Sequence, residues 1–371
     1  MTSGTCRWGI LGTAGIARKN WQAIRLAGNA SLVAVASRSL ERSRGFVAAC
    51  QAACPQPAAP AAVEGYAELV RRSDVDAVYI PLPTGLRKQW VLEAARAGKH
   101  VLVEKPVGVT TADVREMLDE CERHRVQLMD GVMFLHSRRL EVLRRTLDDG
   151  ASVGEVRRIA AQFSFNGADE FFRSDIRMSS QLEPHGCLGD LGWYTIGFAL
   201  WVMKYELPTR VHARELAAAG RADSPGTVPT EMSGELLFRS GVSASFYCSF
   251  RTENQQWADV SGTRGVVHVP DFVLPFFGEE TRFEVTNSVF EITGCDFDMR
   301  RRARVVDVPE YSNRHPTAQE AHLFRDFSAL VTTGRLDPHW GEVALKTQMV
   351  VDACRQSARE GRDVTLPAVA R

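Results

Sequence analysis

Short apolar runs alternate with amphipathic stretches through the first part of the chain. Runs rich in Val, Ile, Leu and Ala are typical of buried strands and occur at 7–12, 31–36, 77–80, 99–103 and 126–129. Helical patterns lie between them, at about 15–26, 66–72, 86–97 and 112–124. The alternation predicts a doubly wound parallel sheet with helices between its strands, an α/β Rossmann domain.

The pattern changes after Asp130. Longer alternating strands follow at short intervals, at 156–165, 235–238, 242–250, 258–261 and 266–269, with loops at 224–226 and 271–278. Helices are expected at 138–147, 188–203, 317–333 and 341–360. This predicts an α+β second domain with a large, mostly antiparallel open sheet. We therefore expect domains at 1–135 and 136–371, with the C-terminal helices able to pack back on the first.

One stretch of the first domain shows neither the apolar runs of a strand nor the pattern of a helix. Between Val47 and Val63 the chain is rich in Ala and Pro, with Pro55, Pro57 and Pro60. This composition predicts an extended surface insertion without chemistry.

The composition narrows the classes of function that the protein can have. The 371 residues carry 45 basic and 45 acidic side chains, so no overall field favours nucleic acid or an anionic membrane. No apolar run approaches the roughly 20 residues that cross a bilayer, and residues 1–7 do not resemble a secretion signal. The eight cysteines lack Cys-x-x-Cys spacing and the nine histidines do not cluster. We expect reduced thiols, a cytoplasmic protein and no metal.

A glycine turn follows the first strand. The cofactor-binding candidates here are Gly12, Thr13, Ala14, Gly15 and Ile16, small enough for a pyrophosphate to approach a helix N-terminus. Ala14 departs from the strict G-x-G-x-x-G/A pattern, and a purely structural turn is the alternative.

The end of the second strand indicates which dinucleotide binds. An acidic residue there would take the ribose hydroxyls, but this chain has Ser37, Arg38 and Ser39. No carboxylate repels a 2'-phosphate, and Arg38 with the two hydroxyls could bind one. This favours NADP(H) over NAD(H), unless Arg38 is simply a solvated loop residue.

Two further constellations carry candidate chemistry. The strand at 99–103 ends in Glu104, Lys105 and Pro106, at the edge of a parallel sheet where ligands bind. Farther along, glycines at 186, 189 and 192 open a helix from which Asp190 and Tyr194 project on one side. A tyrosine beside a lysine is a workable general acid, whereas the structural alternative is glycine-mediated packing with Tyr194 in the core.

Together these motifs resemble the Gfo/Idh/MocA family (glucose-fructose oxidoreductase and inositol dehydrogenase), over about Trp8 to Leu366. The similarity is greatest to the subgroup of plant oxidoreductases, dimeric dihydrodiol dehydrogenases and sugar 3-ketoreductases. The stretches that carry the subgroup resemblance are 36–39, 78–84, 127–131 and 346–348.

The resemblance implies roles for individual residues. Lys105 would be the catalytic lysine, Tyr194 the proton donor or acceptor, and Asp190 a residue that positions substrate. Glu104 would orient the lysine or the nicotinamide. The remaining implied site residues are Pro81, Leu82 and Pro83 for the cofactor, and Asp175, Arg177 and His136 for substrate, with a structural role equally open for His136.

Arg87 departs from the family, which often has histidine after the third-strand turn. Either the nicotinamide end is held differently or the substrate carries charge.

The leading hypothesis is an NADP-dependent oxidoreductase that moves a hydride to or from a carbonyl or secondary alcohol of a sugar, polyol or dihydrodiol. The alternatives are an inactive cofactor-binding regulator and a redox-neutral glycoside hydrolase that holds NAD. A homodimer or higher homo-oligomer is also expected, because the helices after Asp130 are too few to cover one face of the second sheet and cap the cleft as well. That face would present Val242, Ala244, Phe246, Cys248 and Phe250, or their alternates.

Overall fold

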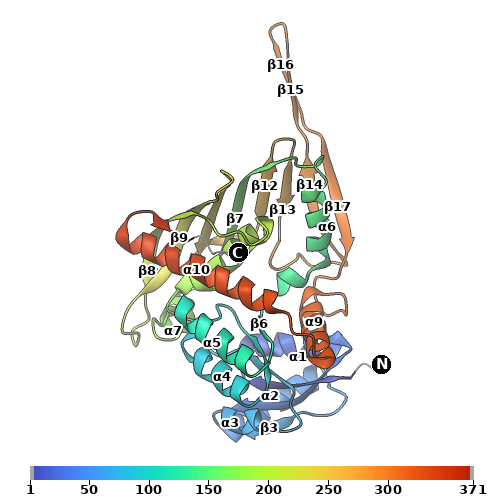
Figure 1. The fold of residues 1–371 in the computed structure, drawn as a ribbon, viewed down its shortest axis with the longest axis vertical. Coiled ribbons are helices and arrows are strands. Elements are labelled where there is room, and N and C mark those ends of the chain that lie inside the picture. The colour runs from blue at the N-terminus through green and yellow to red at the C-terminus, as the bar shows by residue number, and fades with distance from the viewer. Residues whose placement is uncertain (1–3, 368–371) are drawn as a thin grey trace. The chain divides into compact units, whose positions relative to one another are not determined.

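The chain forms two compact units, each assembled from segments that are not consecutive (Figure 1). The computed structural model describes residues 4–367. The first unit takes in the chain up to His136, the short segment Ser179–Pro184, and Asn313–Met349. The second unit holds Ser137–Met178, His185–Ser312 and the residues after Met349. The C-terminal helix α9 (Gln319–Thr333) and the beginning of α10 (Pro338–Glu360) therefore belong to the first unit.

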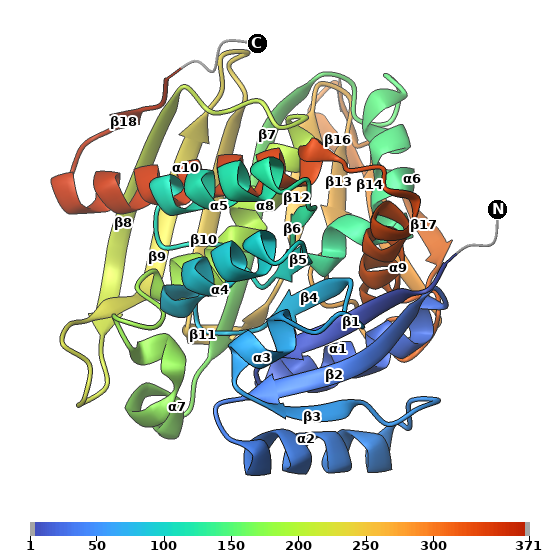
Figure 2. The same ribbon diagram turned by 60° about the horizontal axis from the view of Figure 1, so that its bottom comes forward.

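The first unit contains the expected parallel sheet. Its six strands are ordered β3-β2-β1-β4-β5-β6, and every pair is parallel. Helices cover both faces, with α1 beside α9 on one and α4 beside α5 on the other (Figure 2). This order is that of a doubly wound nucleotide-binding fold, and it confirms the α/β prediction. The bounds are β1 (Cys6–Leu11), α1 (Gly15–Ala27), β2 (Ala30–Ser37), α2 (Leu40–Ala53), β3 (Ala61–Glu64), α3 (Tyr66–Val70), β4 (Ala77–Ile80), α4 (Thr84–Arg96), β5 (His100–Val103), α5 (Thr111–Arg123) and β6 (Leu128–Asp130).

The Ala- and Pro-rich stretch is not an insertion, and that prediction was wrong. Helix α2 runs through it to Ala53, and its end supplies β3, the edge strand that pairs with β2. Trp21 anchors the loop between them, donating from Nε1 to the Cys54 carbonyl at 2.8 Å and accepting from Gln56 Nε2 at 2.9 Å. Alanine is a good helix former, so low side-chain variety here was compatible with a helix.

Helix α9 completes the core beneath β1. Trp8 of β1 is fully buried, its ring lies 5.0 Å from those of Phe324 and Phe327, and its indole N–H donates to Ser328 Oγ at 3.0 Å. A buried indole needs such a partner. Residues from far down the chain thus finish the hydrophobic core that the first strands begin.

The second unit is built on a large mixed sheet with strand order β17-β14-β13-β12-β7-β10-β9-β8-β18. The pairing is antiparallel except between β7 and β10, so the prediction of a mostly antiparallel sheet is confirmed. The bounds are α6 (Arg138–Asp148), β7 (Val156–Asn166), α7 (Asp169–Ser174), α8 (Trp193–Val202), β8 (Arg210–Ala219), β9 (Val228–Leu237), β10 (Ser243–Ser249), β11 (Arg251–Gln255), β12 (Ala258–Gly262), β13 (Val266–Val269), β14 (Glu280–Thr286), β17 (Ala303–Pro309) and β18 (Val364–Thr365).

Of the two faces of β10 that were expected as alternatives for an uncovered surface, the apolar one is covered within the unit. Val242, Ala244 and Phe246 are all at most 5% exposed, because the apolar helix α8 packs on β7 and β10. The alternating positions are polar or amphipathic, such as Ser243 and Tyr247. The expectation of an uncovered face therefore rests on these alternating positions, most of which are half-buried.

A hairpin extends from the end of the β14–β17 pair. Strands β15 (Val289–Thr293) and β16 (Asp296–Arg300) form a two-stranded sheet of their own (Figure 1). Their register places Phe290 opposite Met299 and Ile292 opposite Phe297, so four apolar side chains share one face. All four are at least 57% exposed. The remaining residues of both strands, mainly charged, lie on the other face.

Candidate functional site

The turn between β1 and α1 has the shape that a pyrophosphate requires. Gly12 has φ +116°, and a Cβ there would lie 2.9 Å from Leu82 Cδ2, so only glycine fits. Nothing lies within 4 Å of a Cβ placed on Gly15. The residue before the helix, Ala14, provides no side-chain cap for the thirteen residues of α1, and the first turn carries no acidic residue. These observations fit a dinucleotide phosphate at this helix N-terminus.

The end of β2 places a group of cationic side chains near Gly12. Arg38 is exposed, whereas Ser37 is buried and Ser39 caps α2 by accepting from Arg42 N at 3.4 Å. The Tyr66 hydroxyl lies 4.0 Å from the Cβ position of Gly12. Burial raises the pKa of Tyr66, and the charges of Arg38 and Arg42 oppose that rise. Arg42 and Tyr66 were missed from the sequence, although Arg42 lies in the first turn of α2, close to Arg38 along the chain.

At the end of β5 the Glu104 carboxylate is buried and held by a tyrosine. Tyr79 donates to Glu104 Oε1 at 2.6 Å, and Asn20 Nδ2 donates to the Tyr79 hydroxyl at 2.6 Å. Burial raises the pKa of Tyr79 well above its usual value, and the neighbouring Glu104 charge adds to that rise. A Cβ on Gly131 would lie 3.1 Å from the same carboxylate oxygen. The orientation of Glu104 is therefore fixed from several sides.

Arg87 ties the neighbouring turns together. The Lys105–Pro106 peptide is cis, and Arg87 Nη1 donates to the Pro106 carbonyl. Arg87 Nε donates to the Leu82 carbonyl at 2.7 Å, in the turn formed by Pro81, Leu82 and Pro83. Glu183 Oε1 lies 4.0 Å from Arg87 Nη2. The buried Arg87 charge thus has a counter-charge within the chain, which removes that reason to expect a charged substrate. Glu183 was missed from the sequence because it lies far from Arg87 along the chain.

The second unit brings three of the predicted substrate residues together. Arg177 donates from Nε to Asp190 Oδ2 at 2.7 Å and from Nη1 to Asp175 Oδ1 at 3.2 Å. Asp190, and then Asp175, raise the pKa of Arg177 against the effect of burial. Asp190 lies on a π-helical turn (Leu188–Gly192) that leads directly into α8. Tyr194, one turn later, is 6% exposed and its ring lies 5.6 Å from that of Phe163.

Lys105 and Tyr194 lie in different units, so their joint action stays a prediction.

His136 has strong structural contacts in the first unit. Its Nδ1 lies 2.7 Å from Asp326 Oδ2, and its ring stacks on Trp340 with centroids 4.6 Å apart. His322 Nδ1 lies 3.2 Å from the His136 carbonyl oxygen. These contacts favour the structural role that the sequence left open.

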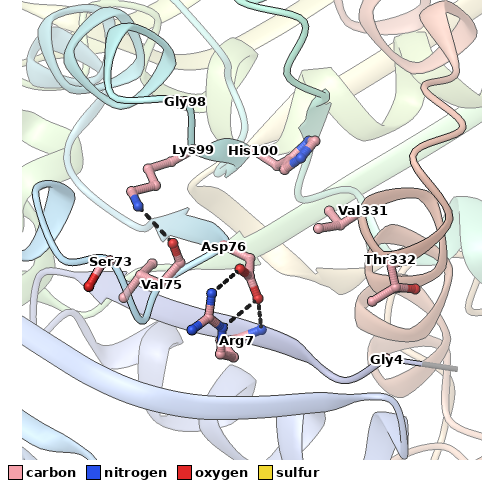
Figure 3. Close-up of a pocket in the computed structure, with 10 residues that line it drawn as sticks. All are labelled: Gly4, Arg7, Ser73, Val75, Asp76, Gly98, Lys99, His100, Val331 and Thr332. Atoms are coloured by element: carbon pink, nitrogen blue, oxygen red, sulfur yellow. Dashed lines mark hydrogen bonds and ion pairs between the residues drawn. The ribbon is translucent and has the colours of Figure 1, made fainter. Parts of the chain in front are cut away.

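A cavity of about 420 Å³ lies at the other edge of the first sheet. Figure 3 shows Arg7 paired with Asp76, and Lys99 donating to the Val75 carbonyl at 2.8 Å. Arg7, Val75 and His100 lie at or just before the N-terminal ends of strands. Ligands of open α/β sheets bind beyond the carboxyl ends, so this cavity is not the candidate site.

Comparisons with known proteins agree with this architecture. Residues 6–132 match an oxidoreductase family with an NAD-binding Rossmann fold, GFO/IDH/MocA, and residues 141–268 match the GFO/IDH/MocA C-terminal domain. The chain belongs to the GFO/IDH/MocA family. It is therefore an oxidoreductase, and the predicted family resemblance is confirmed.

The chain is similar to two named enzymes and to one enzyme of solved structure. A dTDP-3,4-didehydro-2,6-dideoxy-alpha-D-glucose 3-reductase from Streptomyces violaceoruber is 37% identical over 62% of this chain and 66% of its own length. An NADP(+)-dependent D-xylose 1-dehydrogenase from Haloferax volcanii is 30% identical over 97% of this chain and 99% of its own. A 3-ketoreductase from Actinomadura kijaniata, solved with NADP and TDP-benzene, superposes with a TM-score of 0.77 at 27% identity, covering 95% and 98% of the two chains.

Residues 4–367 contain neither a metal-binding cluster nor a membrane-spanning helix. Within that range no group of three His, Cys, Asp or Glu side chains could hold a metal ion. No helix in the same range is both long and apolar enough to span a bilayer.

The Tyr79–Glu104 contact generates a stability prediction. Replacing Tyr79 with Phe leaves a buried carboxylate oxygen and the Asn20 amide without their partner, and we expect it to cost about 1–3 kcal/mol of unfolding free energy. Urea unfolding followed by circular dichroism measures the cost. Tyr247→Phe is the matched control, since its hydroxyl contacts Thr252 Oγ1 in a part-exposed position and should cost less. Equal costs for the two variants would contradict the prediction.

Proposed function

We propose that this chain is an NADP-dependent oxidoreductase that moves a hydride between nicotinamide and a carbonyl or secondary alcohol carbon of a sugar, polyol or dihydrodiol. The observation that carries the proposal is the fixed turn at Glu104–Lys105–Pro106, at the ligand-binding edge of the sheet and held by Tyr79 and Arg87. The named relatives reduce keto-sugars or oxidise xylose, which supports a carbohydrate-like substrate. The cluster of Asp175, Arg177 and Asp190 offers the donors and acceptors that hydroxyl groups need.

The chemistry divides between cofactor and protein. The nicotinamide supplies or accepts the hydride. In the reducing direction the Tyr194 hydroxyl gives a proton to the substrate oxygen, while the Lys105 ammonium stabilises the negative charge that develops there. In the oxidising direction the same proton returns to Tyr194. Asp190, oriented by Arg177, positions the substrate.

The absorbance of the nicotinamide distinguishes the two alternative functions from the proposed one. An inactive cofactor-binding regulator or a redox-neutral glycoside hydrolase produces no net change in nicotinamide absorbance. A screen of sugars, keto-sugars, nucleotide-linked keto-sugars and diols with NADP(H), monitored at the nicotinamide absorbance, therefore tests the proposal. Glycoside cleavage without an absorbance change would contradict it.

The cofactor preference follows from the side chains at the end of β2. We expect Arg38, with Arg42 beside it, to bind the 2'-phosphate, so NADP(H) binds more tightly than NAD(H). Arg38→Ala should cost NADP(H) about 1.5–3 kcal/mol, as for a hydrogen bond to a charged group, and should leave NAD(H) nearly unchanged. Calorimetric titration of both cofactors measures this. The control is Arg44→Ala, because Arg44 is an exposed arginine of α2, the helix that also carries Arg42. Equal affinity of the wild type for both cofactors would refute the assignment.

The proposed roles of Lys105 and Tyr194 predict that they act as a unit. Lys105→Met and Tyr194→Phe should each lower kcat by about 10²- to 10⁴-fold with little change in cofactor affinity. The double variant should be little worse than the worse single variant, because each residue works through the other. Steady-state kinetics on a confirmed substrate, with a deuterated cofactor to show that chemistry limits the rate, provides the measurement. A Tyr194→Phe enzyme that keeps most of its kcat would assign the proton to another residue.

We also propose that the protein is a homo-oligomer, joined through the apolar hairpin face of Phe290, Ile292, Phe297 and Met299. An isolated two-stranded hairpin is marginally stable in water, so an apolar face of this kind favours a partner. A second copy suits it, because two such faces packed on one another about a two-fold axis would each remove the other's four exposed side chains from water.

Sedimentation equilibrium at micromolar concentration tests the hairpin interface. The double variant Phe290→Ser/Phe297→Ser should shift the protein toward monomer, because it removes apolar area from the contact. A matched change on the charged face, Glu291→Gln, should leave the mass unchanged. A wild-type monomer would contradict the proposal.

A further inference from the structure

The segment Ser179–Pro184 is the one part of the chain between Ser137 and Ser312 that belongs to the first unit. It closes on itself, since Glu183 N donates to the Ser179 carbonyl at 2.8 Å and Leu182 N donates to Ser179 Oγ at 3.4 Å. We call it the strap. The second unit resumes immediately after it at His185, and Arg177 precedes it by two residues.

The strap supplies the N-terminal cap that α4 lacks in its own sequence. Pro83 before the helix gives no side-chain cap. Glu183 accepts from Thr84 N at 3.0 Å and from Thr84 Oγ1 at 2.5 Å, and the Leu182 carbonyl accepts from Gly85 N at 2.9 Å. A carboxylate at a helix N-terminus is also favoured by the helix dipole. Two free N–H groups of the first turn are thus satisfied by a distant segment.

Gly85 is needed for this contact. A Cβ at that position would collide with the Gln181 carbonyl oxygen. The backbone of the strap therefore lies directly against the first turn of α4, at a distance that only glycine allows.

Arg87 connects the strap to the turn that carries Lys105. Its side chain is 6% exposed, and its guanidinium faces the Leu82 carbonyl, the Pro106 carbonyl and Glu183 at once. Pro106 directly follows Lys105. One planar cation thus joins the strap to the two turns that we assign to the nicotinamide end of the site. Arginine suits this role because its guanidinium holds several N–H donors in a fixed geometry.

We propose that Arg87 and Glu183 are positioning residues that form a clamp, fixing the point from which the chain runs to Arg177 on one side and to Asp190 and Tyr194 on the other. This inference rests on the proposed roles of Lys105 and Tyr194. Within the first unit, the clamp fixes both ends of the strap relative to the turn that carries Lys105. The clamp also holds the turn of Leu82, whose side chain lies against Gly12, so we expect its loss to slow the chemical step much more than it weakens cofactor binding.

Gly85→Ala is the sharpest test, because it displaces the strap without changing any charge. Alanine favours helix over glycine, so the helix itself should not suffer. We expect amide hydrogen exchange in residues 179–184 to rise at least tenfold, the single-turnover rate of hydride transfer to fall at least tenfold, and the NADP(H) dissociation constant to stay within threefold. Glu183→Gln and Arg87→Lys should give the same pattern, and the last two should be non-additive when combined.

The control is Glu116→Gln, which removes a carboxylate from the exposed ion pair with Lys88 of α4 and should change none of these quantities. Unchanged exchange in the strap of Gly85→Ala and Glu183→Gln would overturn the clamp. Faster exchange with an unchanged hydride-transfer rate would overturn its positioning role. If the wild type transfers no hydride to any substrate, the proposed function fails, while the exchange measurement still decides whether the clamp exists.

Discussion

A carboxylate buried at the end of a strand must be matched by hydrogen bonds, and Glu104 imposes this constraint on the first unit. Tyr79 meets it from the neighbouring strand, Asn20 fixes Tyr79 from α1, and Gly131, directly after β6, leaves room for the carboxylate. Loss of one partner in such a buried network leaves the others unsatisfied. The geometry of the turn that carries Lys105 therefore depends on residues from several separate elements.

The local sequence pattern was enough to predict the turn that carries Lys105, but not the contacts that hold this turn in place. The apolar run before Glu104 and the proline at 106 placed Lys105 at a strand end, and the glycine turn at Gly12 was equally visible. The partners that hold these turns are backbone carbonyls and side chains distant in sequence. The Pro106 carbonyl and Glu183 carry no local signal that would connect them with Arg87.

The missed strands have a related explanation. Strand β3 forms from alanines that favour a strand weakly, and it exists because β2 offers an edge. In β15, β16 and β17 most side chains are exposed, so the alternation of buried and solvated residues that marks a strand is faint. The reverse holds for β13, whose predicted bounds agree with the structure, because its buried valines alternate regularly. For β13 burial imposed a period that the sequence shows, whereas for β15 to β17 pairing alone made the strand. Strands β8 and β14 were also missed, although buried residues alternate in β14.

The discontinuous make-up of the first unit affects how the protein is made. The face of β1 that Trp8 presents is covered by α9, which the ribosome synthesises only after the whole central part of the chain. At typical translation rates, residues 137–312 take roughly 10–35 seconds to emerge. During that interval the nascent nucleotide-binding half carries an uncovered aromatic surface, so its need for chaperone protection ends only when nearly the entire polypeptide has left the exit tunnel.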